Sequence, residues 1–149
     1  MKRSPAREIA MHLSYASVMN PLPMEEQLEV FFSPEHYATL AEEDEAYAEK
    51  PDWDQLEYIR RVASGVAEHA PELDGYIEKY AVNWSFARIS RVCAAILRVA
   101  MYEILYLPEV PYKVAANEAV NLTKLYEDSP AASFVNGILA SFIREEKGE

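Results

Sequence analysis

Apolar residues recur along the chain at the three- and four-residue spacing of helices that bury one face. The first stripe lies between Ser4-Pro5, which is typical of a helix start, and Asn20-Pro21, which is typical of a helix end. Its members are Ala6, Ile9, Ala10, Leu13 and Ala16. The pattern predicts an amphipathic helix close to the N-terminus.

Shorter apolar stripes follow this helix. A second short helix contains Met24, Leu28, Phe31 and Phe32 and is stopped or redirected at Ser33-Pro34, where another acidic helix can open. Up to about Pro51 the apolar pattern is weak, so the sequence does not determine the structure of residues 20–55. Asp52 can cap a helix that ends near Pro71, and its stripe is Leu56, Ile59, Ala63 and Val66. Another short helix contains Leu73, Tyr76, Ile77 and Tyr80.

The most hydrophobic segment is predicted to begin at Asn83 or Ser85 and to run past Ile104. Its apolar stripe covers more than half of the helix circumference, so we expect a central, nearly surrounded helix. Pro111 can open the next helix, and the last one follows the loop at Asp128-Ser129-Pro130. Its stripe is Phe134, Val135, Ile138, Leu139 and Phe142.

The chain has four glycines, nine prolines and few alternating apolar runs, which favours helices over hairpins. With 149 residues, half of them hydrophobic, it can bury a stable core without disulfides or structural metal ions. We therefore predict an all-α fold, a single compact bundle of about seven helices, with residues 1–149 forming one domain.

Charge and cysteine usage narrow the function. The single Cys93 excludes an internal disulfide, and the absence of a continuous apolar block predicts a cytoplasmic protein with no membrane contact. The net charge is −11, yet its distribution is polarised. Lys2, Arg3 and Arg7 lie among the first seven residues, which hold no acid, whereas residues 41–57 hold eight acids and one lysine.

Motifs for catalysis are missing from the sequence. It has no Gly-rich phosphate loop, HExxH or GxSxG motif, so we expect binding rather than an enzyme. His12 has no second His or Cys at metal-ligand spacing, so a surface histidine is the simpler interpretation. We predict no metal and no cofactor.

Two stretches resemble the NusB family. Near the N-terminus AREIAMHLSY matches the opening helix of the family. The second stretch runs from Trp84 to Leu139 and contains NW, RI, AILRVAMYEIL, VPYKVAANEAVNLTK and FVNGIL in the family's order and spacing. The resemblance implies a NusB-like helical fold.

The resemblance also implies a function in the bacterial cytoplasm. Members of the family act in transcription antitermination: they bind the boxA element of nascent ribosomal RNA transcripts with the ribosomal protein NusE and join the RNA polymerase antitermination complex. The operons controlled, the NusE interface, and the choice between a monomer and a homodimer are left open.

The family's RNA-binding region corresponds here to Lys2, Arg3 and Arg7, which a flexible basic arm ahead of the first helix would present to phosphates. For Lys2 and Arg3 the alternative is a solvated terminus. Tyr15 lies two turns beyond Arg7 and is a candidate for base stacking, although a half-buried tyrosine is equally ordinary. Phe134 is a further candidate, but it also fits the core stripe.

The FVNG segment otherwise favours a structural interpretation. Gly137 inside a helix costs about 1 kcal/mol against alanine, which predicts that another helix approaches closely there. The loop before it ends in Ala131, Ala132 and Ser133 and therefore offers no cation to RNA. Arg98 and Glu103, five residues apart, are predicted to pair with other elements.

Two rivals remain. The first is a protein-interaction scaffold of the same fold with weak or no RNA binding, which the thin basic arm and the acidic total favour. The second is the helical domain appended to ribosomal RNA cytosine methyltransferases, and the absence of a catalytic domain in 149 residues speaks against it.

Overall fold

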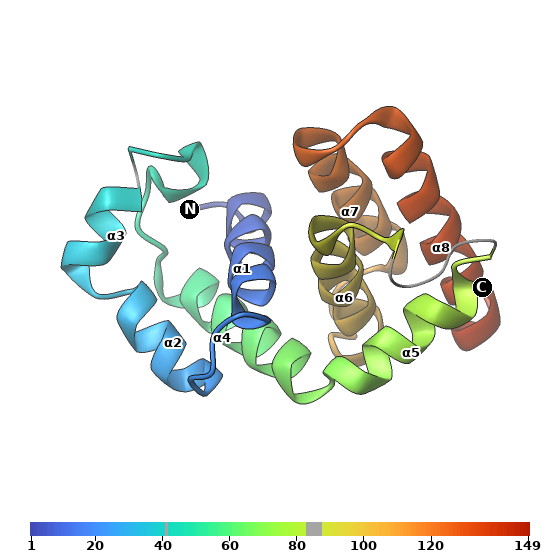
Figure 1. Ribbon diagram of the computed structural model, residues 1–149, viewed down its shortest axis with the longest axis horizontal. Helices are drawn as coiled ribbons and strands as arrows, with labels where there is room; N and C mark the ends of the chain where they lie inside the picture. Colours follow the sequence, from blue (N-terminus) through green and yellow to red (C-terminus); the bar gives the residue numbers. More distant parts are fainter. Residues whose placement is uncertain (41, 83–87) are drawn as a thin grey trace. The chain divides into compact units, whose positions relative to one another are not determined.

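The structure is a computed structural model that describes residues 1–40, 42–82 and 88–149. Its contacts divide the chain into two compact units, Met1–Glu68 and His69–Glu149. Every regular element in these residues is helical: eight α-helices and one short 3₁₀ helix, against about seven predicted (Figure 1). The all-helical fold class is therefore confirmed, while the prediction of a single domain over residues 1–149 stays a prediction.

The first unit is built on two long helices, α1 and α4. Its elements are α1 (Arg3–Ser17), α2 (Met24–Phe31), α3 (Pro34–Leu40), η1 (Glu45–Tyr47) and α4 (Trp53–Glu68). Both α1 and α2 pack against α4, and η1 packs against α1 (Figure 1). Ile9 and Leu13 of α1 and Ile59 and Val62 of α4 are buried, so the core of this unit contains the predicted stripes. Ala16, predicted in the first stripe, is exposed.

An aromatic cluster organises the segment between α2 and α4, which the sequence pattern left undetermined. Phe31, Phe32, Tyr37 and Tyr47 form ring pairs with centroids 5.0–6.3 Å apart. The Tyr37 hydroxyl also donates a hydrogen bond to the Glu49 carbonyl oxygen, at 2.8 Å. Burial raises the pKa of Tyr37 to about 12, so this phenol stays protonated. The cluster holds η1 in place beside α1.

The second unit surrounds the most apolar helix of the protein. Its elements are α5 (Ala70–Tyr80), α6 (Arg91–Tyr106), α7 (Tyr112–Tyr126) and α8 (Ser129–Lys147). The central helix, α6, packs against α5, α7 and α8, and eleven of its sixteen residues are buried (Figure 1). This confirms the predicted central helix. Among the residues that the structure describes, no helix is both long enough and apolar enough to cross a membrane.

Three α-helices in the described residues begin with a side-chain cap. The Asp52, Ser90 and Asp128 side chains each accept a hydrogen bond, at 3.0 Å, from the backbone N–H three residues later. Each bond supplies an acceptor to a backbone N–H of the first turn, which has none within the helix. Asp52 was predicted as a cap, and Asp128 lies in the predicted loop before the last helix.

The helix end predicted near Pro71 is confirmed, because α4 ends at Glu68 and Pro71 lies in the first turn of α5. A proline without an N–H is tolerated in that turn. The described part of the hydrophobic segment is helical from Arg91, capped by Ser90. The predicted starting residues Asn83 and Ser85, like Trp84 of the family motif, lie outside the described residues.

Candidate nucleic-acid interface

The predicted basic arm is part of a helix. Lys2 is the extended N-cap of α1, which begins at Arg3, so the expectation of a flexible arm bearing all three basic residues is wrong. Ser4-Pro5 lies inside the first turn, where the fixed backbone of proline suits a helix. Lys2 is exposed, Arg3 is half-buried, and Arg7 is only 3% exposed.

The two arginines share one aromatic partner on α4. The Arg3 guanidinium lies 4.1 Å from the ring centroid of Tyr58, and that of Arg7 lies 5.7 Å from it. Arg3 Nε also donates a hydrogen bond to Gln55 Oε1 at 2.8 Å. Such cation–π contacts contribute about 0.5–2 kcal/mol each, so both arginines help to hold α1 on α4. The predicted RNA contacts of Arg3 and Arg7 stay predictions, but Arg7 offers little surface to a ligand.

The start of α1 nevertheless favours anions. Its first turn contains no acidic residue, and the exposed Lys2 and half-exposed Arg3 lie where the helix dipole is positive. This combination suits one or two phosphate groups. This site has two accessible basic residues, whereas the sequence predicted a basic arm with three.

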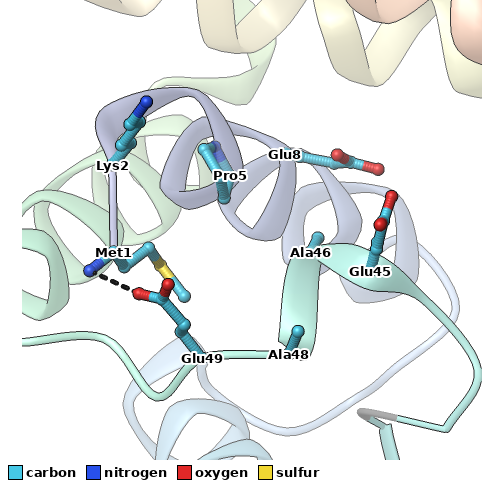
Figure 2. Close-up of a pocket in the computed structure, with 8 residues that line it drawn as sticks. All are labelled: Met1, Lys2, Pro5, Glu8, Glu45, Ala46, Ala48 and Glu49. Carbon is cyan, nitrogen blue, oxygen red and sulfur yellow. Dashed lines mark ion pairs between the residues drawn. The ribbon is translucent and has the colours of Figure 1, made fainter.

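The other face of this N-terminus is acidic. A cavity of about 540 Å³ lies between the start of α1 and η1, and Figure 2 shows Glu8, Glu45 and Glu49 around it. The Met1 ammonium forms an ion pair with Glu49 at 2.9 Å, and Lys2 extends away from this pair. Three carboxylates against Lys2 and the Met1 ammonium leave this cavity with a small excess of negative charge.

Tyr15 and the end of α1 form an exposed apolar segment. Tyr15 is 43% exposed, which agrees with the exposed tyrosine considered for base stacking. Val18, Met19 and Leu22 follow it and are also exposed. Stacking by Tyr15 stays a prediction.

Phe134 belongs to the second unit and is half-buried at the start of α8. It lines a cavity of about 320 Å³ together with Arg88, Cys93 and Ala131. The exposed Arg88 supplies a cation next to the loop, where the sequence predicted none. Sequence reasoning missed this because Arg88 precedes α6 and is distant in sequence from Phe134. The only signal was its place in the RI motif.

Gly137 also differs from the prediction. Among the described residues, no heavy atom other than the adjacent backbone of α8 lies within 4 Å of where its Cβ would be, and Asn136 and Gly137 are both exposed on α8. The expected close approach of another helix is therefore wrong. Exposed residues at this point of the family motif are accessible to a partner.

His12 is not the surface histidine that its sequence context suggested. It is half-buried, its Nδ1 is hydrogen-bonded to the Tyr47 hydroxyl, and its Nε2 lies 3.7 Å from Glu8 Oε2. Burial lowers the pKa of His12, although the nearby Glu8 and Asp44 raise it. Spacing along α1 could not reveal this, because Tyr47 and Asp44 come from another element.

Comparison with known proteins identifies the family. The chain matches the model of the NusB family over residues 4–144. The transcription antitermination protein NusB of Ruminiclostridium cellulolyticum is 39% identical over 140 residues, which cover 94% of this chain and 87% of that protein.

Solved structures agree with the sequence comparison. NusB of T. maritima superposes with a TM-score of 0.78 at 28% identity, covering 97% of this chain and 92% of the other. A structure of the antitermination factors NusB and NusE in complex with dsRNA contains a chain that superposes with a TM-score of 0.74 at 24% identity, covering 96% of each chain, a likeness of fold. Because the family model spans residues 4–144 and the Ruminiclostridium relative matches nearly the whole chain, the protein belongs to the NusB family.

Proposed function

We propose that the protein is a transcription antitermination factor of the bacterial cytoplasm, which binds boxA RNA of nascent ribosomal transcripts together with NusE. It then joins the RNA polymerase antitermination complex. The observation that carries this proposal is the family match over residues 4–144, with relatives that are named as transcription antitermination proteins. A NusB chain of this fold is known in complex with NusE and dsRNA.

The start of α1 supports phosphate binding. Lys2 is exposed, and the Arg3 guanidinium is held in place by Tyr58 and Gln55. A cation that is already ordered loses less conformational entropy when a phosphate binds. The two residues therefore form a small, prearranged site at the positive end of α1.

The cavity beside Phe134 supports a contact with an unpaired base. The half-exposed ring offers a stacking surface, and Arg88 adds a cation that can contact phosphate or stack on a base. Phe134 and Arg88 both belong to the second unit, so this contact is proposed in addition to that of Lys2 and Arg3.

A second candidate is a protein-interaction scaffold of the same fold with weak or no RNA binding. The burial of Arg7 and the net charge of −11 favour it, because both weaken electrostatic attraction to RNA. Assembly into a homodimer is a further possibility that a mass measurement in solution tests directly.

The test is fluorescence anisotropy of labelled boxA RNA titrated with the protein, alone and with NusE, against a scrambled RNA. We expect selective binding that tightens with NusE. Replacing Arg3 or Phe134, as Arg3→Ala or Phe134→Leu, should weaken binding at least about fivefold, because each removes about 1–3 kcal/mol of charge-assisted or stacking contact.

Lys50→Ala is the matched control for charge, since Lys50 is an exposed lysine of the same unit outside the proposed site. It should leave the affinity nearly unchanged. Binding that does not distinguish boxA from the scrambled RNA, even with NusE, would favour the scaffold. Selective binding that is indifferent to Arg3→Ala and Phe134→Leu would place the RNA site elsewhere.

A further inference from the structure

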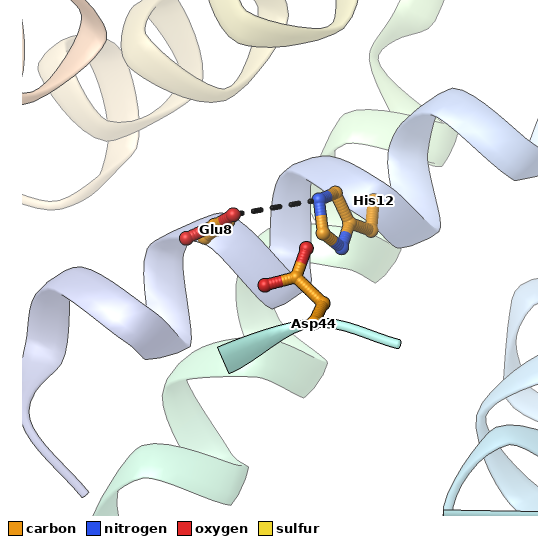
Figure 3. Close-up of side chains that lie close together, drawn as sticks. All are labelled: Glu8, His12 and Asp44. Carbon is orange, nitrogen blue, oxygen red and sulfur yellow. Dashed lines mark ion pairs between the residues drawn. The ribbon is translucent and has the colours of Figure 1, made fainter. Parts of the chain in front are cut away.

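Three potential metal ligands meet beside α1. Glu8 and His12 are one helical turn apart on α1, so their side chains share a face. Asp44, immediately before η1, reaches the same point from another segment. One ligand atom from each residue lies within 4.8 Å of the others, and Figure 3 shows the three side chains converging. This spacing is compatible with one ion between them after small side-chain adjustments.

Other hydrogen bonds already orient two of these groups. Asp44 Oδ1 accepts a hydrogen bond from the Ala46 N–H at 2.9 Å, which fixes the direction of the carboxylate. The Tyr47 hydroxyl contacts His12 Nδ1, while Nε2 is the ring nitrogen that lies near Glu8. A phenol can accept as well as donate, so it is compatible with the tautomer that has a proton on Nδ1 and a free electron pair on Nε2. Metal-binding histidines are commonly held by a partner on their other nitrogen.

Charge and access also favour a cation. The side chains of Glu8 and His12 are only 15% and 21% exposed, so the ion would be partly shielded from solvent. Two carboxylates compensate the charge of a divalent ion. The cavity between the start of α1 and η1 shares Glu8 with this cluster (Figure 2). The first unit as a whole has fourteen acidic and six basic residues.

The ligand types indicate the class of ion. Magnesium and calcium prefer all-oxygen sites, whereas one imidazole with two carboxylates suits a transition metal such as Zn²⁺. Three protein ligands leave a fourth position for water. We propose that Glu8, His12 and Asp44 bind a divalent transition-metal ion, which links α1 to the segment before η1. This site is independent of the proposed RNA contacts.

The test is isothermal titration of the metal-free full chain with ZnCl₂, together with visible absorption after addition of CoCl₂. We expect one ion per chain, ligand-field bands from Co²⁺ that Zn²⁺ displaces, and no competition from MgCl₂. Binding of Zn²⁺ should also raise the melting temperature, because the ion binds the folded chain. His12→Gln and Glu8→Gln should each weaken binding at least tenfold.

Two controls make the result specific. His36→Gln removes an exposed histidine of the same unit, and Glu45→Gln removes an acid of the adjoining cavity. Both should leave Zn²⁺ affinity unchanged. Asp44→Asn keeps the oxygen that caps η1, and circular dichroism checks that each variant is folded. The proposal is overturned if folded wild-type protein shows no saturable binding at millimolar ZnCl₂, or if His12→Gln and Glu8→Gln bind as wild type does.

Discussion

Arg98 shows how much a single residue in an apolar helix reveals. Its position among buried residues of α6 predicted a partner on another element, and the structure confirms Asp74 of α5. The pair is bidentate, with Nε to Oδ1 at 2.6 Å and a second bond at 3.2 Å. The two side chains are 12% and 32% exposed, so solvent screens the pair less than it screens a surface pair. The partner itself could not be predicted, because contacts between helices are not encoded in helical periodicity.

Asp74→Ala should therefore lower the free energy of unfolding by about 1–3 kcal/mol, since it leaves the Arg98 charge partly buried without its carboxylate. Chemical denaturation measures the change. Glu145→Ala is the control, because the Arg144–Glu145 pair is 63% and 58% exposed. We expect less than about 0.5 kcal/mol for that variant. Equal effects of the two substitutions would show that the Asp74 pair contributes no more than a surface pair.

Gly137 is the residue whose interpretation changed most. Its location inside α8 was predicted from the stripe around it, but the structure provides open space where a close contact was expected. Gly137→Ala should raise stability by about 0.5–1 kcal/mol, because alanine restricts the unfolded chain and favours the helix. Thermal unfolding measures this, and Ala140→Gly, at another exposed position of α8, should lower stability by a similar amount. Destabilisation by Gly137→Ala would indicate a steric constraint absent from the structure.

At the scale of elements, α8 is joined to the end of α5 by one carboxylate. Glu146 accepts a hydrogen bond from the Tyr80 hydroxyl and forms an ion pair with Lys79 at 2.9 Å. The Tyr80 hydrogen bond, followed by that of Lys79, lowers the pKa of Glu146 below its usual range. Residues 144–147 thus form the last turn of α8, and Glu146 attaches this turn to α5.

The lowered pKa of Glu146 has a defined consequence for stability. The unfolded chain takes up the proton first, so this contribution is fully present above the ordinary glutamate pKa and is lost as pH falls through the folded value. Glu146→Gln should flatten the loss of stability on acidification, whereas Glu145→Gln, next to it and without these contacts, should not. Urea unfolding between neutral and acidic pH measures both. Parallel pH profiles for wild type and Glu146→Gln would contradict this assignment.

Element types were largely predictable, whereas the candidate sites were not. The stripes and the cap at Asp52 are local features, because helical periodicity and capping depend on residues a few positions apart. Arg7 packs near Tyr58 of α4, and His12 lies beside Asp44, which precedes η1. Such contacts between distant segments leave no periodic signal, so neither the buried arginine nor the metal-like cluster was predicted.

For the whole molecule, net charge is a poor guide to RNA binding. The total of −11 is concentrated in the first unit, with fourteen acidic against six basic residues, and yet that unit contains the anion-favouring start of α1. A protein of this kind attracts RNA only locally and repels it elsewhere. The number of phosphates that it neutralises is therefore the informative quantity, and salt dependence measures it.

If Lys2 and Arg3 neutralise two phosphates of single-stranded boxA RNA, the logarithm of the affinity should fall with the logarithm of salt concentration with a slope of about −1.4. Raising salt from about 50 to about 200 mM should then weaken binding by the protein alone about sevenfold. The double variant Lys2→Ala, Arg3→Ala should reduce the magnitude of the slope by about 1.4, while Lys50→Ala should leave it unchanged. A steep slope that survives the double variant would mean that other cations, such as Arg88 beside Phe134, carry the phosphate contacts.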